Sequence, residues 1–531
     1  MDSIIDSGEI KVSKKTLLHV SEGIYRSVGS ALKEVVNNSF DAKATTVNIN
    51  TNFPQYDFLS IKDDGHGMEL NEFIRIVEGG IGDSKKSVPH KSERPIIGRL
   101  GIGILAIAQV CRSFTLISHH EESKTAFKGK MIFNPSVDKV AKTEEIGKEG
   151  GYAAGKWELI EKPDYDPNKK GVLIYTDDLR LAYLKRFRDD QYRPEKNDTP
   201  LQFDRYFKKF FEEKLKPGGL KSIKELGAYH ELIYELCILL PIVYINDGPV
   251  RSSALNYIDW VDEQSENFIK QKQLELSSYK FDVILDGINL RKSIEFPFPE
   301  LRNGNKQECQ LFYFSYDALV RNRKLKFKGY FFTQEHSLYP REINGLLIRI
   351  KNVGIGLHDS SFLGYDKIES PRDKWISGEV FIEDGLESAL NIDRDSFNEN
   401  DEHFYVLRRE IHKKLKEDVF PYVRKKQSIR NKANRDSKDS ELIEYKKEQI
   451  ESYLSSQLKN IIINYAAIDD IGWDEKTRLL TFPEKFINPK LKIRRESFLN
   501  NLFLFISSVE QISSEKEAEQ IVTIVSKIIL S

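Results

Sequence analysis

The chain has 531 residues, of which 40% are hydrophobic, 31% charged and 11% aromatic, and its formal net charge is −1. At about 150 residues per domain, this length and composition predict a folded globular protein of roughly three or four domains and exclude an intrinsically disordered chain. The near-zero charge gives no sign of bulk attraction to nucleic acid or to a membrane.

Localisation is predicted from apolar runs and cysteines. The longest apolar run, ELCILLPIVYI at 235–245, is about half of the ~20 residues that a bilayer span needs. The first ten residues, MDSIIDSGEI, do not resemble a signal peptide. Cys111, Cys237 and Cys309 lie far apart without a CxxC motif, so we expect reduced thiols in a cytoplasmic protein.

The first 180 residues mix helix and strand patterns. A helix is predicted near 22–42, where apolar residues recur at roughly helical spacing. Strands are predicted at TTVNIN (45–50), FLSIKDD (58–64), FTLISHH (114–120), AFKGKMIF (126–133) and GVLIYTDDL (171–179). Strands with helices to one side favour an α+β layered sandwich for a first domain at 1–180.

Three further regions follow. Residues 181–250 look helical and charged, and we treat them as a connector. Residues 251–400 are rich in strand patterns, which predicts a second α/β domain. Residues 401–531 are predicted to be a charged helical region that ends in an apolar and then amphipathic tail.

A first candidate site lies in KEVVNNSFDA at 33–42. Glu34 and Asn38 are four residues apart and so share one face of a helix, and Asp41 follows one turn later. An amide oxygen can hold Mg²⁺ together with nucleotide phosphates, and a carboxylate can polarise a water toward the terminal phosphate. The alternative is an exposed polar face on which Asn38 caps the helix.

Two further motifs follow within about 70 residues. In IKDDGHGM (61–68), Asp63 at a strand end can accept from an exocyclic amine, although a simple Asp-Gly turn is the alternative. In GRLGIGILAIAQV (98–110), Gly98, Gly101 and Gly103 precede an apolar helix and can cradle an anion. A glycine-rich loop needed for packing is the alternative for this motif. The three motifs together favour a nucleotide site.

A further stretch of the sequence matches a nucleotide-binding P-loop only in part. GGYAAGKW at 150–157 matches the beginning of a P-loop, but Trp157 stands where a Ser or Thr would hold Mg²⁺. We therefore expect no P-loop there.

These motifs resemble those of the GHKL ATPase superfamily, which includes gyrase, the ninety-kilodalton heat-shock chaperone, histidine kinases, MutL and microrchidia proteins. The resemblance implies a Bergerat-type α/β sandwich that binds ATP and Mg²⁺. It implies Glu34 as general base, Asn38 as metal ligand and Asp63 as the partner of the adenine amino group. Residues 79–97 would form the ATP lid, where a mobile charged loop without fixed contacts is the alternative for Ser84 and Lys85. The implied nucleotide-contacting set is Lys33, Asn38, Asp41, Asp63, Gly65, Gly67, Met68, Ser84, Lys85, Gly98, Gly101, Ile102 and Gly103.

The sequence departs from the family at one motif and suggests a further catalytic residue. Gly171 is followed by Val172, where relatives usually carry a threonine hydroxyl beside the base. The stretch LNIDRD, at 390–395, resembles a turn of the heat-shock chaperone that brings an arginine to the γ-phosphate, which makes Arg394 the candidate. Arg394 could instead pair with a neighbouring aspartate. Lys351, in GLLIRIKNVGIG, is a second candidate.

The expected function is an ATP-driven conformational switch. Three outputs stay open: a chaperone-like ATPase acting on a protein client, a DNA-associated ATPase of MutL or microrchidia type in genome defence, and a nucleotide-gated scaffold. A histidine kinase is disfavoured because only about 20 residues precede the helix that carries the first motif, and no phosphoacceptor bundle fits there. A type II topoisomerase is disfavoured because no cleavage domain is recognisable, although a partner chain could carry one.

Partners are predicted from the ends of the chain. A homodimer is expected through residues 1–20 when ATP binds, or through the tail at 497–531, although this tail could equally pack on its own chain. The basic segment RKKQSIRNKANR, at 424–435, could contact DNA, but a solvated helix face is the alternative.

Overall fold

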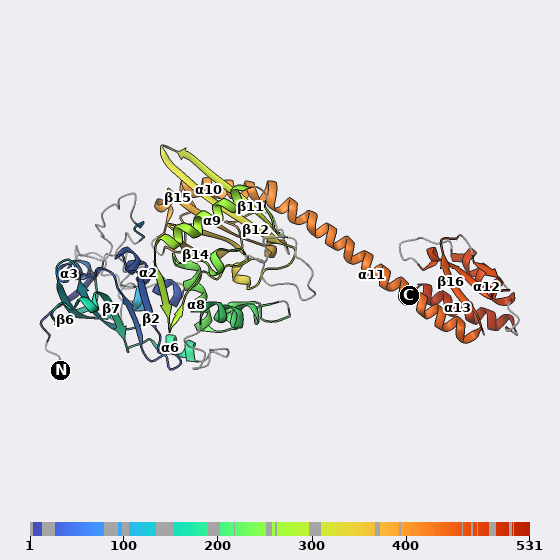
Figure 1. The fold of residues 1–531 in the computed structure, drawn as a ribbon, viewed down its shortest axis with the longest axis horizontal. Coiled ribbons are helices and arrows are strands. Elements are labelled where there is room, and N and C mark those ends of the chain that lie inside the picture. Colours follow the sequence, from blue (N-terminus) through green and yellow to red (C-terminus); the bar gives the residue numbers. More distant parts are fainter. Residues whose placement is uncertain are drawn as a thin grey trace. The chain divides into compact units, whose positions relative to one another are not determined.

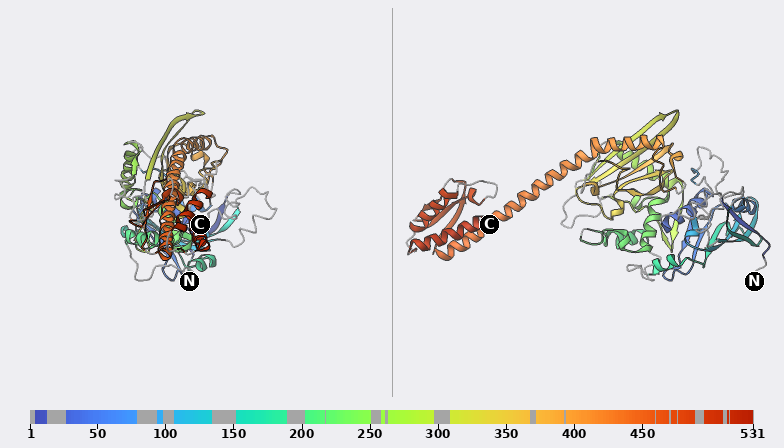
Figure 2. Two further views of the ribbon diagram at one scale, coloured as in Figure 1. Left: turned by 90° about the vertical axis from the view of Figure 1, so that its right-hand side faces the viewer. Right: turned by 180° about the vertical axis from the view of Figure 1, so that it is seen from behind.

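The computed structural model divides into two compact units, Met1–Val423 and Arg424–Ser531 (Figures 1 and 2). Helices and strands occur in both, which confirms the predicted α+β class. The structure describes residues 4–12, 27–78, 94–97, 106–133, 152–188, 202–216, 218–250, 258–260, 263–296, 309–366, 372–391, 394–458, 460–468, 471–474, 476–487, 495–508, 512 and 514–530.

A nine-stranded sheet, in the order β1-β6-β5-β4-β7-β3-β2-β9-β10, forms the base of the first unit. Neighbouring strands are antiparallel, except that β2 and β9 run parallel. The strands are β1 Asp6–Val12, β2 Thr46–Asn50, β3 Leu59–Asp63, β4 Ser113–His120, β5 Thr125–Phe133, β6 Tyr152–Glu161, β7 Gly171–Thr176, β9 Asp282–Leu285 and β10 Ile288–Asn289.

Helix α2, Val28–Asp41, packs on this sheet. It begins at Ser27, whose extended backbone and side-chain oxygen, which accepts from the Ser30 N–H, form an N-cap. Its apolar face shares a core with the sheet through Leu32, Val36, Phe40, Val47 and Ile61. Helix α3, Leu70–Glu78, and the short 3₁₀ helix Ile107–Gln109 also contribute buried residues to this core.

A second sheet in the same unit has six strands in the order β14-β13-β15-β12-β11-β8. These are β8 Ile258–Trp260, β11 Cys309–Val320, β12 Arg323–Gln334, β13 Gly345–Ile350, β14 Val353–Asp359 and β15 Ile376–Asp384. Successive residues alternate between two cores, as the pleat of a strand requires. For example, Phe332 belongs to the core shared with the first sheet, and Phe331 to the opposite one.

Helices cover both faces of the second sheet. Helix α8, Ala228–Leu239, packs against both α2 and β14, and α9, Glu263–Ser278, packs against β11. Helix α10, Glu402–Lys414, contributes Phe404 and Leu407 to the opposite core. The segment before α8 holds α6 Leu181–Arg188, α7 Phe203–Tyr206 and a π-helical turn at Phe207–Glu212.

The structure adds elements that the sequence patterns did not predict. Strands β1 and β14 were missed, and β6 contains most of GGYAAGKW, so that stretch is not a P-loop, as expected. We expected residues 251–400 to form the second domain. In the structure, β9 and β10 extend the first sheet beyond β2.

The second unit is smaller. The long helix α11, Phe420–Gln457, leads into a sheet of β16 Ile462–Ala466, β18 Leu479–Pro483 and β17 Gly472–Asp474, followed by α12 Arg495–Ser508 and α13 Glu515–Leu530. Helices predominate as predicted, and the three short strands are an addition. No helix in the described part of the chain is long and apolar enough to cross a membrane.

Candidate functional site

Helix α2 carries a polar stripe that turns away from its apolar face. At about 100° per residue, the members of the stripe lie within about 140° of one another. Lys33, Glu34 and Asn37 are buried, and Asn38 and Asp41 are half-buried. The members are Ser30, Lys33, Glu34, Asn37, Asn38 and Asp41. The helix thus places Glu34, Asn38 and Asp41 on one face, as their spacing predicted.

Asp63 is the buried acceptor beside this helix. It ends β3 and is 7% exposed. Its Oδ1 accepts from the backbone N–H groups of Gly65 and Val172, at 2.9 and 3.2 Å, and its Oδ2 accepts from Ser39 Oγ of α2 at 2.9 Å. Burial raises the pKa of Asp63 above its usual value, while these three hydrogen bonds oppose the rise. The carboxylate is fixed in place as an acceptor.

Two positions around Asp63 require glycine. Gly67 has φ +81°, and a Cβ there would lie 2.3 Å from the carbonyl oxygen of His119. Gly171 has φ +104°, and a Cβ there would lie 2.2 Å from the carbonyl oxygen of Asp63. The backbone of Val172 therefore reaches Asp63 although its side chain lacks the hydroxyl usual in the family.

Met68 is fixed to the neighbouring strand β4. Its N–H donates to Ser118 Oγ at 2.7 Å, and that hydroxyl lies 2.9 Å from the Met68 carbonyl oxygen. The side chain packs against the core of the first sheet. The strand end at Asp63 and the turn that follows it are thus held rigidly.

The segment Arg94–Ile97 meets both α2 and the second sheet. Asp41 Oδ1 accepts from the Ile97 N–H at 2.7 Å. Lys351 Nζ donates to the Ile96 carbonyl at 2.9 Å, and Arg394 Nη2 donates to the Ile97 carbonyl at 2.5 Å. The two cations that the sequence singled out in the second domain thus contact adjacent carbonyls.

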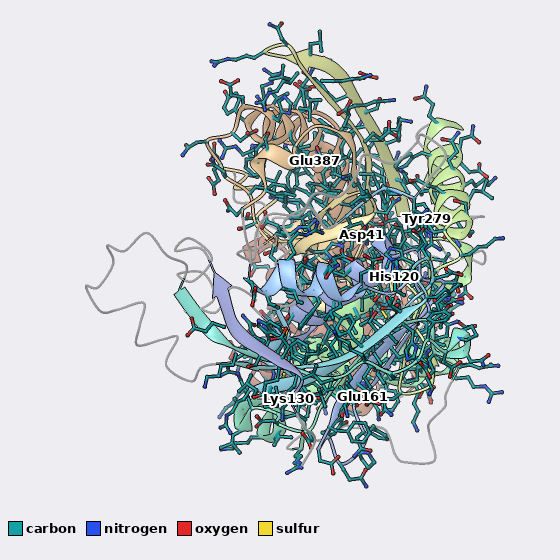
Figure 3. The ribbon with its side chains drawn as sticks, turned by 90° about the vertical axis from the view of Figure 1, so that its left-hand side faces the viewer. Asp41, His120, Lys130, Glu161, Tyr279 and Glu387 are labelled. Atoms are coloured by element: carbon teal, nitrogen blue, oxygen red, sulfur yellow. The ribbon has the colours of Figure 1, made fainter. Side chains whose placement is uncertain are left out.

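Arg94 holds the start of this segment. Its Nη1 donates to the Ala44 carbonyl at 2.6 Å, its Nη2 to the Tyr279 carbonyl, and its guanidinium lies 5.0 Å from the Phe40 ring centre. Asp41, at the end of α2, and Tyr279, just after α9, are labelled in Figure 3. Phe40 and Tyr279 also pack edge to face, with ring centres 5.4 Å apart. Arg94 therefore ties the end of α2 to the end of α9.

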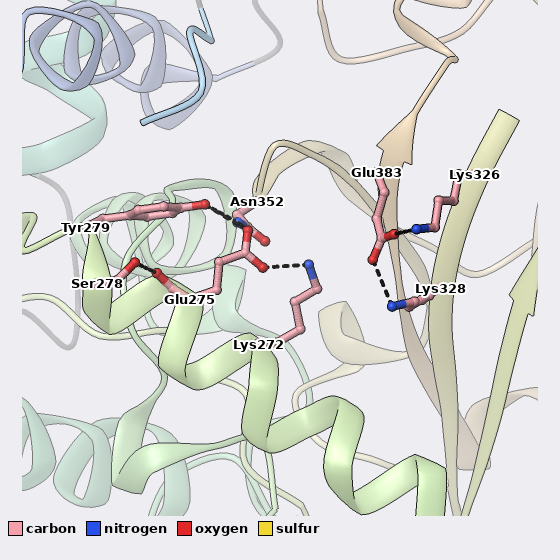
Figure 4. Close-up of polar contacts among 8 residues, drawn as sticks. All are labelled: Lys272, Glu275, Ser278, Tyr279, Lys326, Lys328, Asn352 and Glu383. Carbon is pink, nitrogen blue, oxygen red and sulfur yellow. Dashed lines mark hydrogen bonds and ion pairs between the residues drawn. The ribbon is translucent and has the colours of Figure 1, made fainter. Parts of the chain in front are cut away.

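A tight turn presents Lys351. Lys351 and Asn352 both have positive φ, 52° and 66°, between β13 and β14. Asn352 Nδ2 donates to Glu275 Oε1 and Tyr279 Oη, each at 2.8 Å, which fixes the turn to α9 (Figure 4). Lys351 also lies 3.7 Å from Glu387 Oε1.

The turn that follows the second sheet reaches the centre of the α2 polar stripe. Arg394 Nη1 lies 3.4 Å from Glu34 Oε2, and Lys33 Nζ lies 2.6 Å from Asp395 Oδ1. The Lys33 and Asp395 side chains are 1% and 2% exposed. Within the described residues, the structure brings Glu34 and Arg394 together and directs Lys33 to Asp395.

Helix α8 supports the first turn of α2. Glu235 Oε2 accepts from Ser27 Oγ, the N-cap of α2, at 2.6 Å. Burial raises the pKa of Glu235 from 4.5 to about 7. A Cβ on Gly29 would lie 2.2 Å from Glu235 Oε2, so the two helices approach closely at this glycine.

Some predicted site residues lie outside the described part of the chain: Ser84, Lys85, Gly98, Gly101, Ile102 and Gly103. Sequence reasoning also missed Ser39, Arg94, Glu235 and Asp395. Ser39 lies inside the first motif and, as a hydroxyl next to Asn38, could have been found. The other three are recognised only through contacts with residues distant in sequence.

A comparison with known protein families matches the region that carries the three motifs. Residues 25–147 match the family described as "Histidine kinase-, DNA gyrase B-, and HSP90-like ATPase". The chain carries a GHKL-type ATPase domain. A curated relative from Herpetosiphon aurantiacus, named "Putative type II restriction enzyme HgiDII", is 40% identical over 107 residues, which are 19% of this chain and 16% of that protein. This chain thus covers about a sixth of that relative's length.

Solved structures also resemble parts of the GHKL-containing chain. The N-terminal domain of a DNA repair protein aligns with a TM-score of 0.37 and 12% identity, covering 77% of this chain and 98% of that one. The ATPase region of Saccharomyces cerevisiae topoisomerase II bound to ICRF-187 aligns with a TM-score of 0.32 and 13% identity, covering 75% and 85%.

Proposed function

We propose that the protein is a Mg²⁺-dependent ATPase that acts as a conformational switch. ATP would bind in the first domain and be hydrolysed to ADP and phosphate. The observation that carries this proposal is the 3.4 Å contact between Glu34 and Arg394. This contact joins a carboxylate of the GHKL domain to the guanidinium of the turn that follows the second sheet. Glu34 lies on α2, the helix whose Ser39 donates to Asp63.

Within this proposal, Asp63 accepts a hydrogen bond from the adenine amino group. The remaining acceptor capacity of Oδ2 suits a donor, because two backbone N–H groups already occupy Oδ1. Gly65 and Gly67 are proposed to shape the base pocket by letting the turn after β3 approach the backbone of Ala42 and His119 closely, and Met68 to pack near the base. A Cβ on Gly65 would lie 2.7 Å from the Ala42 carbonyl oxygen, so the strand turn and the end of α2 are close together.

Glu34 serves as the general base, and Asn38 as the protein ligand of Mg²⁺. No group of three or more His, Cys, Asp or Glu in the described ranges is arranged to hold a metal. Mg²⁺ keeps water and phosphate oxygens and needs few protein ligands, so one amide oxygen such as that of Asn38 can suffice. The ion, when bound, supplies charge neutralisation at the phosphates. Asp41 and the glycines and lid residues of 79–103 remain proposed nucleotide contacts, whereas the buried Lys33 is engaged by Asp395.

Arg394 is the proposed arginine finger, and Lys351 the second candidate. Arg394 lies 3.4 Å from Glu34, whereas Lys351 contacts the Ile96 carbonyl and Glu387 of its own domain. A guanidinium can release a carboxylate and engage phosphate oxygens with the same planar set of donors. Stabilising charge in the transition state is the role expected of such an arginine.

The switch is proposed to couple closure of the lid and the domains to a protein partner in a chaperone-like manner. A DNA-associated role in genome defence is the second candidate, and the curated relative named as a type II restriction enzyme supports it. A nucleotide-gated scaffold is the third. A homodimer is the proposed assembly, and a client or DNA the proposed further partner.

Two substitutions test the nucleotide site. Glu34→Ala should bind ATP with unchanged affinity and lose turnover by roughly 10²–10⁴-fold, because it lacks the base. Asp63→Asn should weaken ATP binding by about a hundredfold or more, because its amide places a donor against donors. Binding is measured with a fluorescent ATP analogue, and turnover by phosphate release.

Asp64→Asn is the matched control. Asp64 adjoins Asp63, but its carboxylate accepts from Thr45 and Thr46 N–H groups at 2.7 and 2.9 Å and does not contact the base site. Its ATP affinity should stay within about twofold of wild type. Wild-type turnover in Glu34→Ala would remove the assigned base, and unchanged binding in Asp63→Asn would remove the assigned adenine site.

A further inference from the structure

Two consecutive charged residues of α2 form ion pairs with two consecutive residues of the second domain, and each faces a residue of opposite charge. Lys33 faces Asp395, with Nζ and Oδ1 2.6 Å apart. Glu34 faces Arg394, with Oε2 and Nη1 3.4 Å apart. The first pair is almost completely buried, whereas the Arg394 side chain is 13% exposed. The buried pair is therefore the more firmly fixed of the two.

Asp395 also decides which carboxylate Lys33 uses. Lys33 Nζ lies 3.7 Å from Glu34 Oε1, so Glu34 is its other possible counter-ion. A buried ammonium needs a carboxylate partner, because desolvation without one is costly. With Asp395 in place, Lys33 has its own partner at shorter distance. Without it, Lys33 would compete with Arg394 for Glu34.

The turn that carries Arg394 and Asp395 is held by specific contacts. The Arg394 N–H donates to the Asn391 carbonyl, and the Asn391 N–H to the Ser396 carbonyl, each at 3.0 Å. Arg394 itself has φ +54°, a left-handed conformation that persists only where surrounding contacts maintain it. Behind the turn, a Cβ on Gly356 would lie 2.8 Å from the Asp395 carbonyl oxygen. Strand β14 thus packs directly against the backbone of Asp395.

We propose that Asp395 is a positioning residue: its buried ion pair with Lys33 seats the turn on α2, so that Arg394 is held at Glu34 and at the Ile97 carbonyl. This inference rests on the proposed ATPase function for its kinetic consequence. It gives Lys33 a structural partner in the second domain. The opposing interpretation is that the pair only stabilises the fold and has no influence on Arg394.

Kinetics separate these interpretations. A positioning residue acts through Arg394, so Asp395→Asn should lower kcat at least tenfold and leave KM for ATP within about twofold. In an Arg394→Ala background, the same substitution should cause no further loss of kcat. Asp384→Asn, an exposed carboxylate at the end of β15, is the control and should leave kcat and KM unchanged.

Two kinetic outcomes for Asp395→Asn would overturn the proposal. One is an equal loss of kcat for Asp395→Asn in the wild-type and Arg394→Ala backgrounds. The other is a change in KM without a change in kcat. Should Asp395→Asn fail to fold, the pair Lys33→Met with Asp395→Leu leaves no unpaired buried charge. Its kcat should fall as for Asp395→Asn with KM unchanged, and a large rise in KM would instead place Lys33 at the nucleotide and refute the positioning role.

A second measurement does not depend on ATP turnover. Hydrogen exchange of the full chain should show faster exchange in peptides covering 391–398 and α2 for Asp395→Asn than for Asp384→Asn. If wild-type protein released no phosphate but this difference appeared, the ATPase proposal would fail and the seating of the turn would stand. Equal exchange in the two variants would refute the seating itself.

Discussion

Glu235 lies where α8 supports the N-terminus of α2, and its replacement by glutamine gives a pH-dependent test of the structure. The carboxylate accepts from Ser27 Oγ, and burial raises its pKa from 4.5 to about 7. Other charges near it are Glu231, which raises the pKa further, and Arg186, which opposes the rise. Glutamine keeps the shape and a hydrogen-bonding oxygen but carries no titrating proton.

The direction and size of this pH effect on stability follow from the linkage between proton binding and folding. Because the folded protein holds the Glu235 proton more tightly than the unfolded chain, the contribution of Glu235 to wild-type stability is greatest below about pH 4.5 and falls as the pH rises toward about 7. A rise of this size corresponds to roughly 3 kcal/mol in the free energy of unfolding. Glu235→Gln avoids this loss. Relative to wild type, it should therefore gain about 2.5 kcal/mol between pH 5 and pH 8.

Pulse proteolysis in urea, following peptides from α2 and α8, measures this difference in the whole chain. Glu231→Gln is the control, since Glu231 lies one turn earlier on α8 and pairs with the half-exposed Arg186. Such a partly exposed ion pair contributes at most about 1 kcal/mol to the free energy of unfolding. A raised pKa of Glu235 is refuted if the stability difference between Glu235→Gln and wild type is the same at pH 5 and pH 8, or if wild type gains stability on the variant as the pH rises.

Two further predictions concern the second sheet and the long helix. Arg349→Met should lower the free energy of unfolding of the first unit by about 3–5 kcal/mol in urea denaturation, because Glu379, which is fully buried and lies 2.5 Å from Arg349 Nε, would lose its counter-ion. Adding Glu379→Leu should restore much of that loss. A small loss of stability in Arg349→Met alone would contradict this prediction. If α11 contacts DNA, replacing Lys425, Lys426 and Arg430 by glutamine should reduce the slope of log K against log salt for duplex binding by about 0.9 for each phosphate that the variant no longer neutralises, as measured by fluorescence anisotropy. The control Lys447→Gln, whose lysine pairs with Glu444 at 3.2 Å, should leave this slope unchanged. Equal slopes in wild type and both variants would exclude this surface.

The sequence predicted those parts of the site that depend on local spacing. Glu34, Asn38 and Asp41 fall on one face of α2 because helical period alone decides it. Asp63 was recognisable as a carboxylate at a strand end followed by glycines. In contrast, Lys33 and Asp395 are 362 residues apart, and Ser27 and Glu235 are 208 apart. No local pattern announces such contacts, because they are created when the second sheet packs on α2.

The fold shows the same division. Strands with clear alternation, such as β2, with Val47 and Ile49 buried, were predicted. Strand β6 was missed because its beginning, YAAGKW, is poor in the β-branched residues that mark strands. The membership of β9 in the first sheet depends on parallel pairing with β2, more than 230 residues earlier in the chain, and hydrophobic patterns do not specify strand order.

The contacts of α2 constrain how the proposed switch can move. Arg349 donates to the Ile238 carbonyl at 2.7 Å, which fixes the end of α8 to the second sheet. If α8 moves with that sheet, the polar contacts of α2 with this body include Ser27–Glu235 at its start and, further along, Lys33–Asp395 and Glu34–Arg394. The hydroxyl contact can tilt without exposing a charge, whereas opening the buried ion pair leaves two charges to be resolvated. We therefore expect domain movement to pivot near Lys33 and to be accommodated at Ser27, so that Glu235→Gln alters stability without changing the Arg394–Glu34 contact.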